Sequence, residues 1–198
     1  MNGDQTGVAG EKDVRVPVRP GVVTQQIEVA PGLMILRVAP DGWELPDFLP
    51  GQYVVLGLPA GAPRCADSDP EPPSGDPNKL IRRAYSIASS SVAREYLEFY
   101  ITLVRSGELT PRLFSLQVGQ RLWVGRKVTG MFTLRDVPQD KQLVLLATGT
   151  GIAPYMSMVR TVLATEGTQR FAVVHGARHS WDLGYQGELI AVQRACLS

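Results

Sequence analysis

Residues 143–154 of the chain read Leu-Val-Leu-Leu-Ala-Thr-Gly-Thr-Gly-Ile-Ala-Pro. The apolar run Leu143–Ala147 is typical of a parallel strand that is covered on both faces, and the glycines after it mark a tight turn. Pro154 fits the first turn of a helix, where the missing backbone N–H costs no hydrogen bond. The stretch therefore predicts a strand, a glycine-rich turn and a helix in immediate succession.

The residues after this stretch add a second strand and a second helix. A helix is expected over Pro154–Thr165, an apolar strand over Phe171–His175 and another helix over Gly187–Ala195. A strand, a helix and a parallel strand in this order form a βαβ unit. Because the character of the sequence changes near Gln139, we assign residues 139–198 to a separate α/β domain.

The glycine-rich turn is a candidate binding site for a dinucleotide. Gly149, Thr150 and Gly151 lie between the predicted strand and the predicted helix. Backbone N–H groups and the positive end of the helix dipole point outward there and can hold a diphosphate. A tight turn without a ligand is the ordinary alternative, but the strand before it and the helix after it favour dinucleotide binding.

The end of the second predicted strand bears on the choice of nucleotide. An NAD site places an acidic residue there, about 20 residues after the glycine turn. This chain has His175-Gly176-Ala177-Arg178-His179 in that place. The Arg178 cation suits the 2′-phosphate of NADP, so the sequence favours NADP over NAD. Taken alone, Arg178 is more simply explained as a solvated surface residue.

Residues 19–138 carry a different pattern, of short strands separated by Pro and Gly. The expected strands are Val22–Val29, Leu33–Val38, Tyr53–Leu58, Arg83–Ser89, Leu97–Arg105 and Arg121–Val128, and one helix is expected over Pro111–Gln117. Residues 59–79 are crowded with Pro, Gly, Asp and Ser, which predicts a loop insertion between strands. Many short strands with one helix indicate a closed or nearly closed antiparallel barrel.

The start of the expected helix in the barrel is a second candidate site. Gly107-Glu108-Leu109-Thr110-Pro111 combines a glycine turn, a good N-cap residue in Thr110 and a good first helical residue in Pro111. A buried helix start in a barrel can bind an anion. A simple capped helix explains every one of these residues equally well.

The third candidate site is Arg83-Ala84-Tyr85-Ser86, on an expected strand. Arginine supplies a forked cation for phosphate, tyrosine a flat ring for stacking and serine a small hydroxyl. Strand alternation sends Arg83 and Tyr85 to one face and Ser86 to the other. Periodicity therefore leaves open whether all three meet one ligand, since an exposed arginine and a core tyrosine are the ordinary explanation.

Composition excludes several classes of protein. The formal net charge of +1 argues against wrapping of nucleic acid or of an anionic membrane, and no apolar run is long enough to span a bilayer. The polar lead-in, residues 1–18, lacks the apolar core of a signal peptide. Cys65 and Cys196 are the two cysteines, which leaves no ligand set for a zinc or an iron–sulfur cluster. We therefore expect a cytoplasmic protein without a bound metal.

Several motifs occur together in a fixed order. They are Pro50-Gly51-Gln52-Tyr53, Arg83-Ala84-Tyr85-Ser86-Ile87-Ala88-Ser89, Leu97-Glu98-Phe99-Tyr100, Gly107 to Leu113, Ala147 to Tyr155 and His175-Gly176-Ala177-Arg178. In this combination the chain, from about Val22 to its end, resembles the bacterial ferredoxin–NADP⁺ reductase family. The resemblance implies an antiparallel Greek-key β-barrel that binds flavin, over residues 19–138, followed by a Rossmann-like NADP-binding domain.

The resemblance also implies roles for individual residues. It implies that Arg83 binds the flavin diphosphate, that Tyr85 stacks on the isoalloxazine ring and that Ser86 lies near flavin N5. Tyr85 and Ser86 are therefore the implied catalytic residues. The other implied FAD contacts are Ala84, Tyr100, Ile101, Thr102, Leu109, Thr110 and Thr150. The implied NADP contacts are Gly149, Thr150, Gly151 and Arg178.

The implied activity is electron transfer between NADPH and a ferredoxin or flavodoxin through FAD, by a monomer. Two alternatives stay open. One is the reductase component of an oxygenase, and the other is a flavin-binding module without turnover. The second follows from an expected truncation, because members of the family continue with further strands beyond the point where residues 139–198 end.

Overall fold

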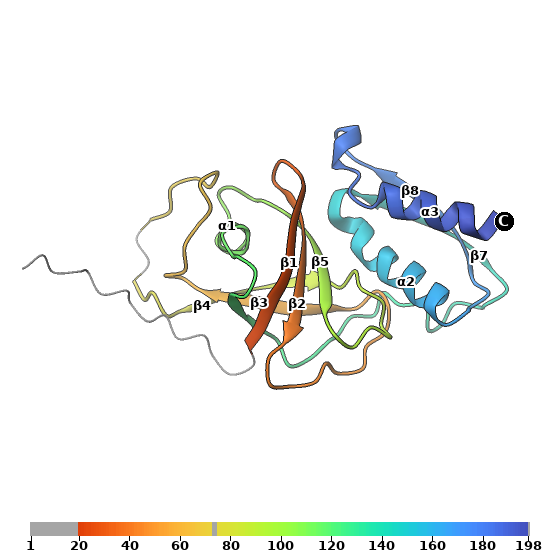
Figure 1. The fold of residues 1–198 in the computed structure, drawn as a ribbon, viewed down its shortest axis with the longest axis horizontal. Helices are drawn as coiled ribbons and strands as arrows, with labels where there is room; N and C mark the ends of the chain where they lie inside the picture. Colours follow the sequence, from red (N-terminus) through yellow and green to blue (C-terminus); the bar gives the residue numbers. More distant parts are fainter. Residues whose placement is uncertain (1–19, 73–74, 198) are drawn as a thin grey trace, which may run out of the picture.

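The computed structural model describes residues 20–72 and 75–197, so the predicted lead-in, residues 1–18, lies outside the described residues. A six-stranded antiparallel sheet comes first, and a parallel pair of strands follows it (Figure 1). The six strands, in the spatial order β4-β3-β6-β1-β2-β5, are β1 Pro20–Ala30, β2 Leu33–Pro40, β3 Tyr53–Pro59, β4 Leu80–Ser86, β5 Leu97–Thr102 and β6 Arg121–Val124. Just beyond β4, the Ala88 N–H donates to the Glu98 carbonyl of β5 at 2.8 Å. The two end strands of the sheet thus approach each other, and the predicted, nearly closed antiparallel barrel is confirmed.

The barrel encloses one apolar core. Strands β2, β3, β5 and β6 contribute alternate side chains to it, as expected for a sheet with one covered face. The largest fully buried side chains of this core are Met34, Leu36, Leu56, Ile87, Leu97, Phe99, Ile101, Leu109, Leu113 and Leu122. The short helix α1, Thr110–Phe114, reaches this core through Leu113, and so it is fixed to the barrel wall.

Three predicted strands and the predicted helix end earlier than expected. The Ile87 N–H donates to the Gln52 carbonyl and the Ala88 N–H to the Glu98 carbonyl, so the chain leaves the β3 ladder after Ser86 and crosses toward β5. The prediction of a strand up to Ser89 is therefore wrong. Strand β5 ends at Thr102 instead of Arg105, β6 at Val124 instead of Val128, and α1 at Phe114 instead of Gln117.

The βαβ unit is confirmed. Its elements, in chain order, are β7 Gln142–Thr148, η1 Gly149–Ile152, α2 Ala153–Ala164, β8 Arg170–Gly176, η2 Ser180–Asp182 and α3 Gln186–Leu197. Strands β7 and β8 pair in parallel, with Leu143 opposite Phe171 and Ala147 opposite His175. Met156 of α2 and Leu189 of α3 both pack in one cluster with Ala147, so both helices lie on the same face of the pair.

The prediction that Leu143–Ala147 is covered on both faces is wrong for the described residues. Leu145 and Ala147 are buried beneath the helices, whereas Val144 and Leu146 on the opposite face are 71% and 68% exposed. In residues 20–72 and 75–197 helices cover only one face of this pair, and the continuous apolar run therefore overstates the burial of β7.

A buried carboxylate joins the barrel to the α/β unit. Glu98 of β5 accepts hydrogen bonds from Arg37 Nε at 2.7 Å, Arg160 Nη1 at 2.6 Å and the Tyr185 hydroxyl at 2.9 Å. Arg160 of α2 also pairs with Glu188 of α3 through two contacts of 2.6 Å. Burial by itself would raise the pKa of Glu98, but Arg160 and Arg37 hold the pKa below its usual value. The carboxylate thus stays ionised and fixes α2 and α3 against the barrel.

No helix among the described residues is both long and apolar enough to cross a bilayer.

Candidate functional site

A cleft of about 390 Å³ lies where the barrel meets the α/β unit. Strands β4 and β5 supply one wall, and the turn after β7 supplies another. Its lining comprises Ala84, Tyr85, Ser86, Tyr100, Ile101, Thr102, Val104, Thr110, Thr150, Gly151 and Ala153. The structure thus brings together most of the residues for which the resemblance implies flavin contacts, although they come from four separate segments.

The Tyr85 side chain lines this cleft and also packs against the barrel core. The ring lies edge-on to Phe99, with 6.4 Å between centroids and 71° between planes. Burial raises the pKa of Tyr85 to about 12, despite the opposing effect of the nearby Arg83 cation. The side chain is therefore neutral at physiological pH and offers a flat aromatic surface.

Ser86 lines the same cleft as Tyr85 even though strand alternation sends neighbours to opposite faces. Ser86 is the last residue of β4, opposite Tyr53 of β3. Because the chain turns toward β5 immediately after Ser86, the end of the strand bends over the cleft. Tyr85 and Ser86 therefore line the same cleft, and their contact with a single ligand stays a prediction.

Arg83 lies at the rim and does not line the cleft. Its Nη2 donates to Glu108 Oε2 at 2.6 Å, and both side chains are more than half exposed. Sequence reasoning quoted Glu108 as part of a motif but missed it as the partner of Arg83. Its position next to the predicted anion site is the signal that could have suggested such a pair.

The predicted N-cap at Thr110 is wrong. Leu109 occupies the N-cap position without a side-chain hydrogen bond, and Thr110 is the first residue of α1. The Thr110 hydroxyl instead accepts from the Val104 N–H at 3.0 Å and donates to the Val104 carbonyl at 3.2 Å. The hydroxyl closes the loop before the helix, which competes with capping. Leu109 itself is buried in the barrel core.

A second, larger cleft of about 670 Å³ lies beside the first and shares Thr102 with it. It is lined by the β1–β2 turn, by Thr148 and Gly149 at the end of β7, and by residues 176–179 and 181–182 after β8. Gly149 has φ +51°, a conformation that favours glycine. The His175 ring donates from Nε2 to the Gly149 carbonyl at 2.8 Å and thereby holds the turn in place.

The predicted NADP residues are divided between the two clefts. Gly149 and Arg178 line the larger cleft, whereas Thr150 and Gly151 line the smaller one. The glycine turn therefore borders both, and a ligand that passes over the turn would reach from one cleft into the other.

Sequence reasoning missed an aromatic pair in the larger cleft. The rings of His179 and Trp181 are stacked, 4.6 Å apart and 5° from parallel. An acidic residue, Asp182, lies in the same cleft, but its carboxylate accepts from the His179 backbone N–H at 3.2 Å and lies 3.2 Å from His179 Nδ1. Arg178 thus gives this cleft an exposed cation, whereas the Asp182 carboxylate already has His179 as its partner.

An antiparallel barrel joined to a strand, a glycine turn and a helix, with clefts at the junction, defines the class of barrel-plus-nucleotide-domain oxidoreductases. Residues 145–196 match the family described as the oxidoreductase NAD-binding domain. The chain is 37% identical over 139 residues to the ferredoxin–NADP reductase of Azotobacter vinelandii, which covers 70% of this chain and 47% of that protein. It is 34% identical to the flavodoxin/ferredoxin–NADP reductase of Escherichia coli, over 70% of this chain and 49% of that protein. The chain belongs to the ferredoxin–NADP reductase family.

Solved structures agree with the fold. A ferredoxin NADP⁺ reductase from Neisseria gonorrhoeae with bound FAD and NADP superposes with a TM-score of 0.70 over 89% of this chain and 64% of that one, at 22% identity. A cytochrome P450 reductase from Amycolatopsis superposes with a TM-score of 0.71 over 89% of this chain and 48% of that one, at 27% identity. The chain spans about half the length of the curated relatives it matches.

Proposed function

We propose that this chain binds FAD and NADP(H) and serves electron transfer between NADPH and a one-electron carrier protein, a ferredoxin or a flavodoxin. The observation that carries the proposal is that Tyr85 and Ser86, from the barrel, line one cleft with Thr150, from the α/β unit. A flavin ring on Tyr85 would then lie beside the turn over which a nicotinamide must approach. We infer the identity of the carrier protein, a ferredoxin or a flavodoxin, from the names of the relatives.

In this proposal residues 19–138 form the flavin domain and residues 139–198 the nucleotide domain. The neutral ring of Tyr85 stacks on the flavin, and the Ser86 hydroxyl lies near its N5. Ala84, Tyr100, Ile101 and Thr102 border the flavin, and Arg83, Leu109 and Thr110 serve its diphosphate. Bound flavin would supply the exchange between two-electron and one-electron chemistry. The protein's part is orientation and electrostatics.

The proposal for nucleotide binding rests on the glycine turn, which borders both clefts, and on Arg178 in the larger one. Gly149, Thr150 and Gly151 offer backbone N–H groups to a diphosphate at the start of α2, which is twelve residues long. Arg178 is placed to meet a 2′-phosphate. We further propose that the protein acts as a monomer in the cytoplasm, in keeping with its low net charge and two cysteines.

A second candidate function is the reductase component of an oxygenase, favoured by the likeness to the cytochrome P450 reductase of Amycolatopsis. No group of three or more metal-binding side chains occurs among the residues that the structure describes. Comparing reduction of flavodoxin with reduction of an oxygenase partner separates the two functions. A flavin-binding module without turnover would instead bind FAD and fail to reduce ferricyanide with NADPH.

Arg83→Ala is expected to weaken FAD binding about 5- to 30-fold. Removal of one charge-assisted phosphate contact costs roughly 1–2 kcal/mol once solvent screening of an exposed arginine is included. The measurement is the dissociation constant of FAD, from flavin fluorescence or absorbance titration of the apoprotein.

The matched control is Arg82→Ala, because Arg82 is the neighbouring exposed arginine, and its guanidinium lies 5.8 Å from the Trp123 ring centre. Arg82→Ala should leave the FAD dissociation constant within about twofold, since this side chain points to the other face of the strand. A wild-type protein that takes up no flavin on reconstitution would refute the proposed function.

Arg178→Ala is expected to reduce the preference for NADPH over NADH by about 5- to 30-fold. A 2′-phosphate carries nearly two charges at neutral pH, and its pairing with one exposed arginine contributes roughly 1–2 kcal/mol. The measurement is the ratio of kcat/KM for the two nucleotides, at low and at high salt. An unchanged ratio in an active variant would identify Arg178 as a surface residue without a role in specificity.

A further inference from the structure

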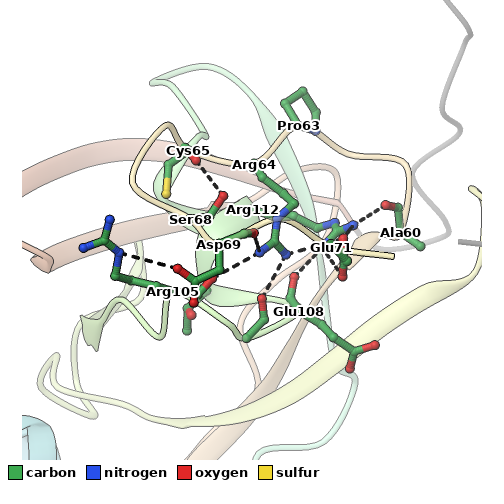
Figure 2. A network of polar contacts seen from close by, with 12 residues as sticks. Ala60, Pro63, Arg64, Cys65, Ser68, Asp69, Glu71, Arg105, Glu108 and Arg112 are labelled. Atoms are coloured by element: carbon green, nitrogen blue, oxygen red, sulfur yellow. Dashed lines mark hydrogen bonds and ion pairs between the residues drawn. The ribbon is translucent and has the colours of Figure 1, made fainter. Parts of the chain in front are cut away.

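Residues 60–72, in the insertion between β3 and β4, form a segment that we call the brace. The brace is not a free loop. Figure 2 shows that it lies against residues 105–115, the loop and helix α1 that border the flavin cleft. The Cys65 N–H donates to the Pro111 carbonyl and the Asp69 N–H to the Arg105 carbonyl, both at 3.0 Å. The Ser115 hydroxyl donates to the Pro63 carbonyl at 2.7 Å. The two segments are thus joined along their whole length.

Arg64 of the brace binds the backbone of the loop directly. Its Nη1 donates to the Gly107 carbonyl at 2.9 Å, and its Nη2 donates to the Arg105 carbonyl at 3.2 Å. The same Nη2 donates to the Asp69 carbonyl within the brace at 3.0 Å. The Arg64 side chain is only 15% exposed, and its hydrogen bonds to both segments hold them in one arrangement.

Glu71 and Arg112 form the deepest contact of the brace. The Arg112 side chain is 3% exposed, and its Nη2 lies 2.6 Å from Glu71 Oε2. Its two terminal nitrogens also donate to the Glu108 and Ala60 carbonyls. The hydrogen bond from Arg112 holds the pKa of Glu71 below its usual value, so the carboxylate is ionised at neutral pH. A buried cation with this set of acceptors has little freedom to move.

The contacts of the brace lead to the flavin cleft through Glu108. The backbone carbonyl of Glu108 is held by Arg112, and its carboxylate holds Arg83 at the rim. In the same loop the Thr110 hydroxyl bridges back to Val104, and both residues line the cleft. A shift of the brace would therefore move the cleft wall and the cation that stands beside it, while leaving Tyr85 in the barrel core.

We propose that the brace contributes to flavin binding, and that its residues Glu71 and Arg64 are positioning residues for the phosphate-binding side of the cleft. The proposal rests on the proposed function, since it requires that flavin binds here. It concerns the phosphate-bearing part of FAD and not the ring, because the hydrogen bonds that join the brace to the cleft wall run to residues 105–115 and not to the end of β4 that carries Tyr85 and Ser86.

The test compares FAD with riboflavin, which has the same ring but no phosphate. Dissociation constants for both are measured by flavin fluorescence for the wild type, Glu71→Gln and Arg64→Met. We expect both variants to bind FAD about tenfold more weakly, the size of one charge-assisted phosphate contact, with riboflavin binding within about twofold of the wild type. Asp67→Asn is the matched control, because it removes one exposed carboxylate from the same segment, and it should change neither constant.

Each result decides one question. A wild type that binds neither FAD nor riboflavin would refute the proposed function, and the brace proposal with it. A wild type that binds both, with variants in which the two constants change together or not at all, would overturn the brace proposal alone. Arg64→Met decides the matter if Glu71→Gln fails to fold, because it leaves the Glu71–Arg112 pair intact.

Discussion

Replacing Arg160 with methionine is expected to lower the free energy of unfolding by about 3–5 kcal/mol, the usual cost of removing one partner of a buried ion pair. Arg160 pairs with Glu98, whose side chain is 1% exposed, and it also donates to the Ala88 carbonyl at 2.8 Å. Methionine preserves much of the side-chain volume but none of the charge. The loss should appear as a lower midpoint of urea unfolding with a similar slope.

The pH dependence of the unfolding free energy of Arg160→Met tests the same ion pair in a second way. In the wild type the pKa of Glu98 is lowered, so its contribution to stability is complete above the unfolded value near 4.5 and is lost as the pH falls through the lower folded value. Without Arg160, only the hydrogen bonds from Arg37 and Tyr185 oppose the effect of burial, so the pKa of Glu98 rises and protonation relieves the weakly compensated charge. The difference in unfolding free energy between wild type and variant should therefore shrink as the pH falls from 7 toward 4.

Arg94→Met is the matched control for Arg160→Met. Arg94 also pairs with a carboxylate, that of Asp47, but the two side chains are 55% and 89% exposed. An exposed pair contributes at most about 1 kcal/mol, so this variant should unfold close to the wild type at every pH. If Arg160→Met costs no more than Arg94→Met, the buried network does not hold the α/β unit to the barrel.

Gly51→Ala is expected to destabilise the protein by about 2–5 kcal/mol, the sum of a left-handed backbone penalty and overpacking. Gly51 has φ +97°, and an added Cβ would lie 1.9 Å from the Phe132 carbonyl oxygen. That oxygen belongs to the backbone and cannot turn away as a side chain can. The Phe132 ring packs on Tyr155 of α2, 5.6 Å between centroids, so the displaced loop would also disturb the start of the α/β unit.

Gly42→Ala separates the two causes. Gly42 has φ +75°, but nothing lies within 4 Å of its would-be Cβ. It should cost only the backbone penalty, about 1–2 kcal/mol. Thermal unfolding of both variants provides the comparison. Equal losses in the two would show that close approach of Phe132 to Gly51 is unimportant.

Much of the fold could be predicted because its signals are local. The apolar run Leu143–Ala147, the glycines and Pro154 specify a strand, a turn and a helix through the preferences of neighbouring residues. The same holds for the short strands of the barrel. Their ends could not be predicted as well, because the partners that terminate β4, the Gln52 and Glu98 carbonyls, lie in segments distant from β4 in the sequence or on another strand.

In the candidate site, too, features encoded by local sequence signals could be predicted and contacts between distant residues could not. The motif around Tyr85, together with the resemblance, named most of the residues that line the smaller cleft, although Arg83 and Leu109 are not among its lining residues. It did not predict that Glu108 holds Arg83, or that residues 60–72 support the loop before α1, because those pairs are 25 or more residues apart and no periodic pattern encodes the partner of a distant charge.

Tyr100 illustrates what only the tertiary structure decides. The resemblance implies that it borders the flavin, and it does line the cleft, yet its hydroxyl donates to the Asp182 carbonyl at 3.1 Å and accepts from the Gly184 N–H at 2.9 Å. Alternation along β5 sends Phe99 into the barrel core and Glu98 and Tyr100 toward the α/β unit. The sequence by itself determined the alternation, and the packing of α2 and α3 on that face determined that these two polar groups join the domains, since a buried polar group must take its partner from whatever element covers it.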